Sequence, residues 1–373
     1  MKFIINATNL SSGGALQVTR SLMYEWGRSD AGHEFHFFLS PYFGESDLSM
    51  QRPWLHITRL AEKPVYGTVQ MSRHRRFMQQ QELKIGPDAI FTVFGPSLWR
   101  PEGPHLCGFA NGVFLFSSDA FIKERFRKGL FSKLSYALRR MLLFRELKNN
   151  ADHFWVETET AAKALSREVH ISSSAISVIG NTYPGLLRYA PVAPDGDRLR
   201  LLYLSAYYPH KNFEILPSLI GQLAATNRKV TFLLTLPESA FQKLAQQISV
   251  AGYLENIGPV TTDQLQSCYD QCDAAFIPSL LETFSASFPE AMQTGKPILC
   301  SDRPFAHDIC GDAALYFDPL NVQDIAARIE AIASSEALRQ TLTQKGFARL
   351  AKMETPEGRA QKLLSLLQKI AKR

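Results

Sequence analysis

Residues 277–302 read IPSLLETFSASFPEAMQTGKPILCSD, and this stretch decides the fold of the C-terminal half. An apolar strand is predicted to end just before a loop rich in Ser and Thr, and a helix is predicted from about Ser287 to Thr294. Gly295 ends that helix and Pro297 prevents its continuation, so the apolar Ile298 to Cys300 begin another strand. This order of strand, loop, helix and strand is typical of parallel α/β architecture.

The same alternation continues along the whole chain, whose 373 residues are too many for one ordinary core. The stretch YAPVAPDGD at 189–197 has linker chemistry and predicts a domain boundary near residue 190. The predicted fold class is α/β, with two Rossmann-like domains, 1–190 and 191–355, facing an interdomain cleft. The last helix, within 356–373, is expected to pack back on the first domain. Strands are predicted at 2–6, 34–39, 54–58, 89–94, 106–109, 153–156, 176–179, 198–204, 230–234, 253–256, 274–277 and 297–300, and helices at 15–26, 213–223, 238–250, 263–270, 322–333 and 356–372.

Composition narrows the class of protein. A hydrophobic fraction of 45% with 20% charged residues is that of an ordinary globular protein. Five cysteines are an odd number, which argues against a disulfide framework and for a reducing compartment, with Cys268 and Cys272 as packing residues. No signal peptide and no bilayer-spanning apolar run is visible, so a cytoplasmic protein is expected, with a peripheral position on the inner face of the plasma membrane left open.

Two glutamates in the quoted stretch are candidate ligand-binding residues. Glu282 lies on the loop at a strand's carboxyl end, where open α/β sheets bind ligands, and Glu290 lies in the first helical turn. The small residues Ser285 and Ala286 let backbone amides approach an anion such as a pyrophosphate. A structural alternative remains open, because Ser287 and Glu290 have the spacing of a capping box.

The stretch resembles the donor-site signature of glycosyltransferase family 4, which has the glycosyltransferase B fold. Matching positions are Pro278, Ser279, Glu282, Phe284, Glu290, Ala291, Met292, Gly295 and Pro297, and the resemblance extends through 301–302 and 311–319. It implies that Glu282 contacts hydroxyls of the donor hexose and that Glu290 binds the ribose. Thr283 and Ser285 stand where the family often has Gly, and they join the predicted donor-binding residues.

A second piece, LLYLSAYYPHKN at 201–212, resembles the family's Arg-x4-Lys clamp on the donor diphosphate. Lys211 matches the Lys, whereas Ala206 stands at the Arg position, so a protonated His210 is expected to compensate. Ser205 is included in the predicted donor site. Val260, after a short strand, resembles the family's loop along the nucleobase.

The N-terminal half offers fewer candidates. Gly13 and Gly14 precede a helix and resemble the family's glycine-rich loop, which touches the donor; a plain helix-start turn is the alternative. The family's His-Asp position appears here as Phe109 to Gly112, so the His is absent and Asn111 stands near the Asp. His105 is a weak substitute for the His. Thr158-Glu159 and Asn181 resemble family positions and also fit structural hydrogen-bonding roles.

A basic segment lies at 121–148, where nine basic and two acidic residues give +7 against +6 for the whole chain. Apolar residues alternate with the cations in a helical pattern that favours binding to a membrane surface. A smaller basic cluster lies at 73–76. Nucleic acid is the rival partner, but no nucleic-acid-binding motif accompanies the segment.

The leading hypothesis is a retaining glycosyltransferase (a hexosyltransferase). It would move a hexose from a GDP- or UDP-sugar to a hydroxyl of a lipid-linked glycan in bacterial surface polysaccharide biosynthesis, such as O-antigen, core or capsule. Lys211, Glu282 and Asn111 are the catalytic candidates. No metal or other cofactor is expected, since no Asp-x-Asp motif is placed to carry one. Two alternatives remain: a nucleotide-sugar epimerase of the same fold, and a non-catalytic nucleotide-sugar-binding partner subunit.

Overall fold

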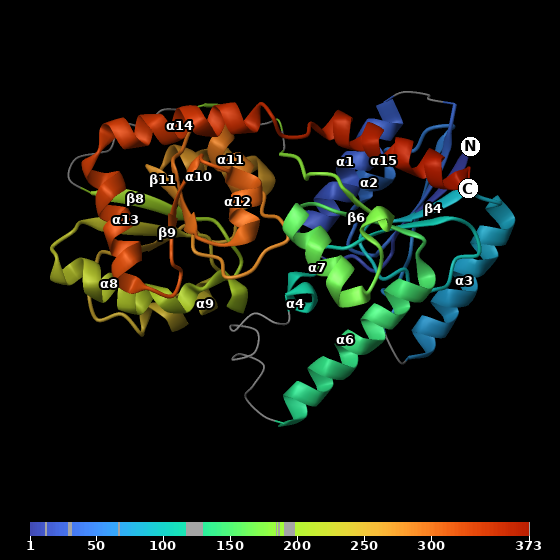
Figure 1. Cartoon of the computed structure of the whole chain (residues 1–373), viewed down its shortest axis with the longest axis horizontal. Helices are drawn as coiled ribbons and strands as arrows, with labels where there is room; N and C mark the ends of the chain where they lie inside the picture. The colour runs from blue at the N-terminus through green and yellow to red at the C-terminus, as the bar shows by residue number, and fades with distance from the viewer. Residues whose placement is uncertain are drawn as a thin grey trace. The chain divides into compact units, whose positions relative to one another are not determined.

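The computed structural model describes residues 1–11, 13–28, 32–65, 68–116, 130–183, 185, 187–189 and 198–372. The chain divides into two compact units, Met1–Asn181 with Glu354–Arg373 and Thr182–Met353. The linker expected near residue 190 falls at 190–197, outside the described residues, and so that boundary stays a prediction. Each unit is an α/β layer structure around one parallel sheet (Figure 1).

Unit 1 is built on seven parallel strands in the order β3-β2-β1-β4-β5-β6-β7. Their bounds are β1 Lys2–Ala7, β2 Glu34–Leu39, β3 Leu55–Arg59, β4 Ala89–Thr92, β5 His105–Gly108, β6 His153–Val156 and β7 Ile176–Val178. The helices are α1 Gly14–Arg28, α2 Glu45–Leu48, α3 Val69–Ile85, α4 Gly112–Leu115, α6 Leu130–Asn150, α7 Glu159–Val169 and α15 Pro356–Ala371, with a 3-10 turn at Ser173–Ala175.

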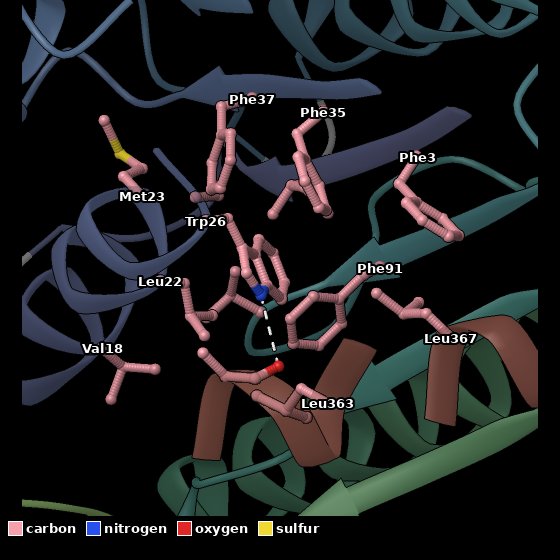
Figure 2. Packing of buried hydrophobic residues seen from close by; sticks show 14 of the residues in the cluster. Phe3, Val18, Leu22, Met23, Trp26, Phe35, Phe37, Phe91, Leu363 and Leu367 are labelled. Atoms are coloured by element: carbon pink, nitrogen blue, oxygen red, sulfur yellow. Dashed lines mark hydrogen bonds between the residues drawn. The ribbon is translucent and has the colours of Figure 1, made fainter. Parts of the chain in front are cut away.

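The C-terminal helix α15 completes the core of unit 1. Trp26 of α1 stacks on Phe35 of β2 with ring centroids 4.8 Å apart. Its Nε1 donates a hydrogen bond to the Ala360 carbonyl of α15 at 3.2 Å, the dashed line in Figure 2. Leu363 and Leu367 of α15 are fully buried against the same aromatic cluster. The last helix therefore belongs to the fold of unit 1, although it follows unit 2 in the sequence.

Unit 2 is built on six parallel strands in the order β10-β9-β8-β11-β12-β13. Their bounds are β8 Leu199–Tyr203, β9 Val230–Leu234, β10 Leu254–Asn256, β11 Ala274–Ile277, β12 Ile298–Ser301 and β13 Ala314–Phe317. The helices are α8 Leu216–Ala225, α9 Glu238–Ala245, α10 Leu265–Asp270, α11 Ser287–Gln293, α12 Pro304–Cys310, α13 Val322–Ser334 and α14 Glu336–Leu350, and 3-10 turns lie at Pro209–Lys211, Phe213–Ile215 and Thr262–Gln264.

The predicted fold class, two Rossmann-like α/β domains, is confirmed by the two sheets, each of which places its first strand beside its second and fourth. Some details differ. The helix expected at 213–223 begins with a 3-10 turn, and the one expected at 238–250 ends at Ala245. The five cysteines are free, buried thiols, and Cys268 and Cys272 are among them, as expected for packing residues. None of the helices described is long and apolar enough to cross a membrane.

Candidate functional site

The strand order of unit 2 reverses between β8 and β11, and the loops after these two strands meet. Such a switch point at the carboxyl ends of parallel strands leaves a crevice where α/β sheets bind ligands. The Leu280 amide of the second loop donates a hydrogen bond to the His210 carbonyl of the first at 2.7 Å. The two segments that the sequence singled out are therefore tied together by backbone.

Lys211 and Glu282 face each other across this point. The Lys211 ammonium lies 2.5 Å from Glu282 Oε1, with 16% and 10% of the two side chains exposed. The Tyr203 hydroxyl donates to the Lys211 carbonyl, and Asn212 has φ of +65°. The Asn212 amide group donates to the Pro319 carbonyl at 2.9 Å. Because these contacts fix the backbone around Lys211, its ammonium is held at the carboxyl edge of the sheet.

The loop after β8 also holds Ser205 and His210. The Ser205 amide donates to Thr235 Oγ1 at 3.1 Å, and its hydroxyl donates to the Ala206 carbonyl at 3.0 Å. His210 is half-buried, and its ring stacks on that of Tyr208 with centroids 5.6 Å apart. The His210 imidazole therefore lies on the same loop as Lys211 and next to it in the chain. Ala206, at the position that matches the family's Arg, carries no charge.

The loop between Glu282 and α11 is mostly buried. Thr283 and Ser285 are nearly inaccessible, and Phe284 packs against the apolar cluster under the loop. Ser279, earlier in the same loop, has a buried hydroxyl without a hydrogen-bond partner among the residues described. After α11, Gly295 takes φ of +73°, and a Cβ there would lie 2.4 Å from the Tyr189 ring. Only glycine fits, and the predicted end of this helix is confirmed.

Glu290 is buried inside α11. The Tyr269 hydroxyl of α10 donates to its Oε2 at 3.2 Å, and burial raises the pKa of Glu290 to about 7. The capping-box alternative is wrong, because the residue preceding α11 is Ala286, and no side chain caps this helix. Ser287 donates instead to the Leu204 carbonyl at 3.4 Å. The carboxyl group is therefore held by a phenol, close to its protonation midpoint at neutral pH.

Val260 lies in the loop after β10 and packs, half-buried, on the same apolar cluster as Phe284. The carboxyl-edge loops after β8, β10 and β11 thus supply all the site residues predicted in the second half of the chain, except Ala286 and Glu290, which lie at and within α11.

The candidates in unit 1 occupy the carboxyl edge of their own sheet. Gly13 follows β1 with φ of +68°, and Gly14 is the first residue of α1. Asn111 follows β5 and directly precedes α4, where its side chain is exposed and makes no capping bond. Their position relative to Lys211 and Glu282 stays a prediction.

His105 is not a substitute for the missing histidine, and that suggestion is wrong. Its ring is buried between the Thr92 hydroxyl, 2.9 Å from Nε2, and the Asn150 carbonyl, and burial lowers its pKa to about 4. Thr158 accepts a bond from the Ala161 amide at 3.2 Å and so caps α7. Asn181 accepts a bond from Arg359 of α15. The structural roles considered for Thr158 and Asn181 are confirmed.

Sequence reasoning missed two side chains at the site, Tyr269 and Thr235. Tyr269 positions the Glu290 carboxyl group, and Thr235 holds the Ser205 amide. Neither lies in a motif with a recognisable spacing. The strand order provides the only signal, since it brings the ends of β8, β9 and β11 side by side.

A comparison with known protein families points to the same part of the chain as the site geometry. Residues 190–349 match the family model described as "Glycosyl transferases group 1". The matched residues lie within unit 2, and unit 1 lies outside the match. A curated relative, "O-antigen chain mannosyltransferase B" of Escherichia coli, is 27% identical over 153 residues, which are 39% of this chain and 40% of the relative. The chain aligns with less than half the length of each of the two curated relatives it matches.

Solved structures extend the likeness beyond the matched residues to the whole chain. Sucrose-phosphate synthase from Thermosynechococcus elongatus has a TM-score of 0.77 at 17% identity, covering 99% of both chains. Anabaena Alr3699/HepE in complex with UDP-glucose has a TM-score of 0.72 at 13% identity, covering 99% of this chain and 100% of that one. These identities are low, so the likeness concerns the fold, which is that of glycosyltransferases B.

Proposed function

We propose that the protein is a retaining hexosyltransferase. It transfers a hexose from a GDP- or UDP-hexose to a hydroxyl of a lipid-linked glycan in the synthesis of a bacterial surface polysaccharide. The observation that carries the proposal is the Lys211–Glu282 pair at the β8–β11 switch point of unit 2, within the residues that match the family model. The relative that acts on an O-antigen chain supports the polysaccharide, and the neighbour with bound UDP-glucose supports the class of donor.

Lys211 binds the donor diphosphate in this proposal. Its ammonium is partly desolvated, so its attraction for a phosphate is stronger than that of a surface lysine. Charge builds on the leaving diphosphate as the sugar bond breaks, and a fixed cation stabilises this charge in the transition state. His210, on the same loop, adds a second cation when it is protonated.

Glu282 orients the hexose. Its carboxylate pairs with the Lys211 ammonium. A diphosphate that takes over the ammonium releases Glu282 to accept hydrogen bonds from sugar hydroxyls. The remaining donor-site residues are Ser205, Val260, Thr283, Phe284, Ser285, Ala286 and Glu290, with Glu290 on the ribose and the amides of 283–286 on phosphate oxygens.

The transfer needs no dedicated protein base. The acceptor oxygen forms a bond to the anomeric carbon while the bond to the diphosphate breaks, and the acceptor proton passes to the leaving phosphate oxygen. Asn111, Gly13 and Gly14 of unit 1 contact the reacting sugars in this scheme. The exposed side chain of Asn111, which makes no capping bond, leaves its amide available for such a contact.

In this proposal the protein docks on the inner face of the membrane through the exposed face of helix α6. Leu134, Leu138, Met141 and Leu142 are each about half exposed or more and recur at helical spacing. Arg139, Arg145 and Lys148 are exposed on the same helix, whereas Phe144 and Leu147 are buried and anchor it. Figure 1 shows the first part of α6 running away from its own sheet. Residues 121–129 of the basic segment lie outside the described residues.

Binding and turnover test the proposal. Calorimetry with UDP, GDP and their hexoses should identify one tight nucleotide, and Lys211→Ala should weaken it by about tenfold or more, the loss of one charge-assisted contact. Glu282→Gln should lose the hexose contribution but keep nucleotide binding. The matched control is Glu330→Gln, which breaks the surface pair with Arg228 and should change neither.

Product analysis separates the alternatives. With a glycolipid acceptor, the expected result is release of nucleotide and a new glycosidic bond with the donor's anomeric configuration. Conversion of the nucleotide-sugar without acceptor would establish an epimerase. Tight nucleotide binding with no turnover on any glycolipid would establish a non-catalytic subunit, and either result overturns the transferase.

A further inference from the structure

Three metal-binding side chains gather at the amino end of the unit 1 sheet, away from the carboxyl edge discussed above. They are Glu34 and His36 of β2 and His56 of β3, and their ligand atoms all lie within 4.8 Å of one another. No other group of three such residues was found in the described part of the chain. The proposed transfer reaction uses none of them.

Strand register brings the three together. His36 and His56 are paired positions of the parallel strands β2 and β3. Glu34 is two residues before His36, so both side chains leave the same face of β2. The two imidazoles stack with centroids 4.7 Å apart and planes 23° from parallel. Two adjacent strands therefore present the ligands from a rigid scaffold rather than from a loop.

The ligand spacing is close to that of a metal site. Glu34 Oε1 lies 2.9 Å from His36 Nε2 and 3.2 Å from His56 Nε2. Zinc binds nitrogen and oxygen at about 2.0–2.2 Å, which places tetrahedral ligand atoms roughly 3.4 Å apart. The three ligand atoms already lie within 4.8 Å of one another, and binding requires the side chains to rotate until they face one point.

We propose that Glu34, His36 and His56 form a binding site for Zn²⁺, with water as the fourth ligand. Two imidazoles and a carboxylate suit zinc and the other late first-row divalent cations. Glu34 Oε1 forms a hydrogen bond with His36 Nε2 and lies 3.2 Å from His56 Nε2. On binding, the single proton of each neutral ring moves from Nε2 to Nδ1 through solvent, so each Nε2 lone pair faces the metal and both imidazoles stay neutral.

The site clamps the edge of the sheet. β3 is the outermost strand in the order of its sheet and lies beside β2, and a metal shared by His36 and His56 would link the two strands by their side chains. Lys2 competes with the metal for Glu34, since the Lys2 ammonium lies 3.8 Å from Glu34 Oε2. The function is therefore structural, and any cation that binds only the folded state stabilises it.

Calorimetry with ZnCl₂ on the full chain, free of any histidine tag, tests the site. We expect one Zn²⁺ per chain and an increase in melting temperature that a chelator reverses. His56→Ala should weaken binding tenfold or more, and so should His36→Gln, a second variant in case the first folds poorly. Lys2→Gln should strengthen binding, because it removes the competing cation.

Two controls make the outcome decisive. His307→Ala removes another exposed histidine, paired with Asp302 at 2.7 Å but outside any three-ligand group of the described residues, and it should bind zinc like the wild type. Co²⁺ should give the intense visible bands of a four-coordinate site without thiolate charge transfer, which excludes the cysteines. The site is refuted if His56→Ala and His36→Gln bind zinc as the wild type does, or if the wild type binds none below millimolar concentration.

Discussion

The phenol of Tyr269 donates a hydrogen bond to Glu290 Oε2 at 3.2 Å, and both side chains are buried in unit 2. This bond favours the ionised carboxylate, but desolvation outweighs it and raises the pKa of Glu290 to about 7. The group therefore costs stability when it ionises in the folded protein.

Glu290→Gln should remove this pH dependence. Between the ordinary pKa of 4.5 and about 7, the folded state holds a proton that the unfolded state has lost, so this residue's contribution to stability falls as pH rises through that window. The amide keeps an acceptor for Tyr269 and never ionises. The stability of the variant relative to the wild type should rise by on the order of 3 kcal/mol from pH 4.5 to 7.5.

Urea denaturation of both proteins across that pH range measures the difference. The difference is the useful quantity, because buried His74 and His105, whose pKa values burial lowers to about 4, give the wild type an opposite slope below pH 6.5. A difference that stays flat with pH would show that Glu290 is not desolvated.

The sequence predicts an element of the fold when the buried face of that element is apolar. Strands β8 to β12 and the end of α11 follow from apolar runs and from Gly295, whereas β13 at Ala314–Phe317 is not among the predicted strands. The sequence does not predict helix α3, because the buried face of this helix is Met71, His74, Met78 and Glu82, half of it polar. Glu82 is satisfied there by the Trp99 indole and the amides of 102 and 103. Such partners arise from tertiary packing and leave no periodic apolar signal.

In the candidate site too, some residues can be predicted from the sequence, whereas their contacts depend on tertiary packing. Lys211 and Glu282 are visible in the sequence because the segments that hold them resemble the family's donor-site motifs, and Glu282 also lies on the loop after an apolar strand. The sequence does not show that the two side chains form a pair. Lys211 and Glu282 are 71 residues apart in the chain, and they meet because β8 and β11 are neighbouring strands. Tyr269 is further from prediction, because an aromatic residue on a short helix most often serves packing alone.

The Lys211–Glu282 pair should show a coupling energy larger than a surface pair. Lys211→Ala leaves a largely buried carboxylate without its cation, and Glu282→Ala leaves the reverse, so each single change should cost about 2 kcal/mol. The double variant should recover about 1 to 3 kcal/mol of the sum.

The Arg228–Glu330 pair is the matched comparison, with 29% and 50% of its side chains exposed. Its coupling should be below about 1 kcal/mol. Denaturant unfolding of both sets of four proteins measures the two energies. Equal couplings would mean that Lys211 and Glu282 are solvated in solution.

Leu363→Ala should destabilise unit 1 rather than unit 2. Leu363 of α15 is fully buried beside Trp26, and removing a buried leucine side chain costs about 2–5 kcal/mol. Lys369→Ala on the exposed side of the same helix should cost less than about 0.5 kcal/mol. Hydrogen exchange resolved by peptide locates the effect, and faster exchange in β8 to β13 with β1 to β4 unchanged would contradict the assignment of α15.

The exposed face of α6 should bind anionic membranes. The test is sedimentation with phosphatidylcholine vesicles with and without phosphatidylglycerol. Each cation near an anionic surface contributes about 1 kcal/mol, so Arg139→Gln with Arg145→Gln should weaken binding to anionic vesicles about thirtyfold. Leu138→Ser with Met141→Ser should weaken it too, because these side chains are 50% and 59% exposed and would insert among the lipids.

The matched control is Leu83→Ser with Lys84→Gln on α3, where Leu83 is 77% exposed but stands outside any basic segment. It should bind vesicles as the wild type does. Raising the salt concentration should release the wild type, since screening shortens the reach of the attraction. Equal binding to neutral and anionic vesicles would leave the cations without a role, and unchanged binding by both α6 variants would move the membrane contact away from this helix.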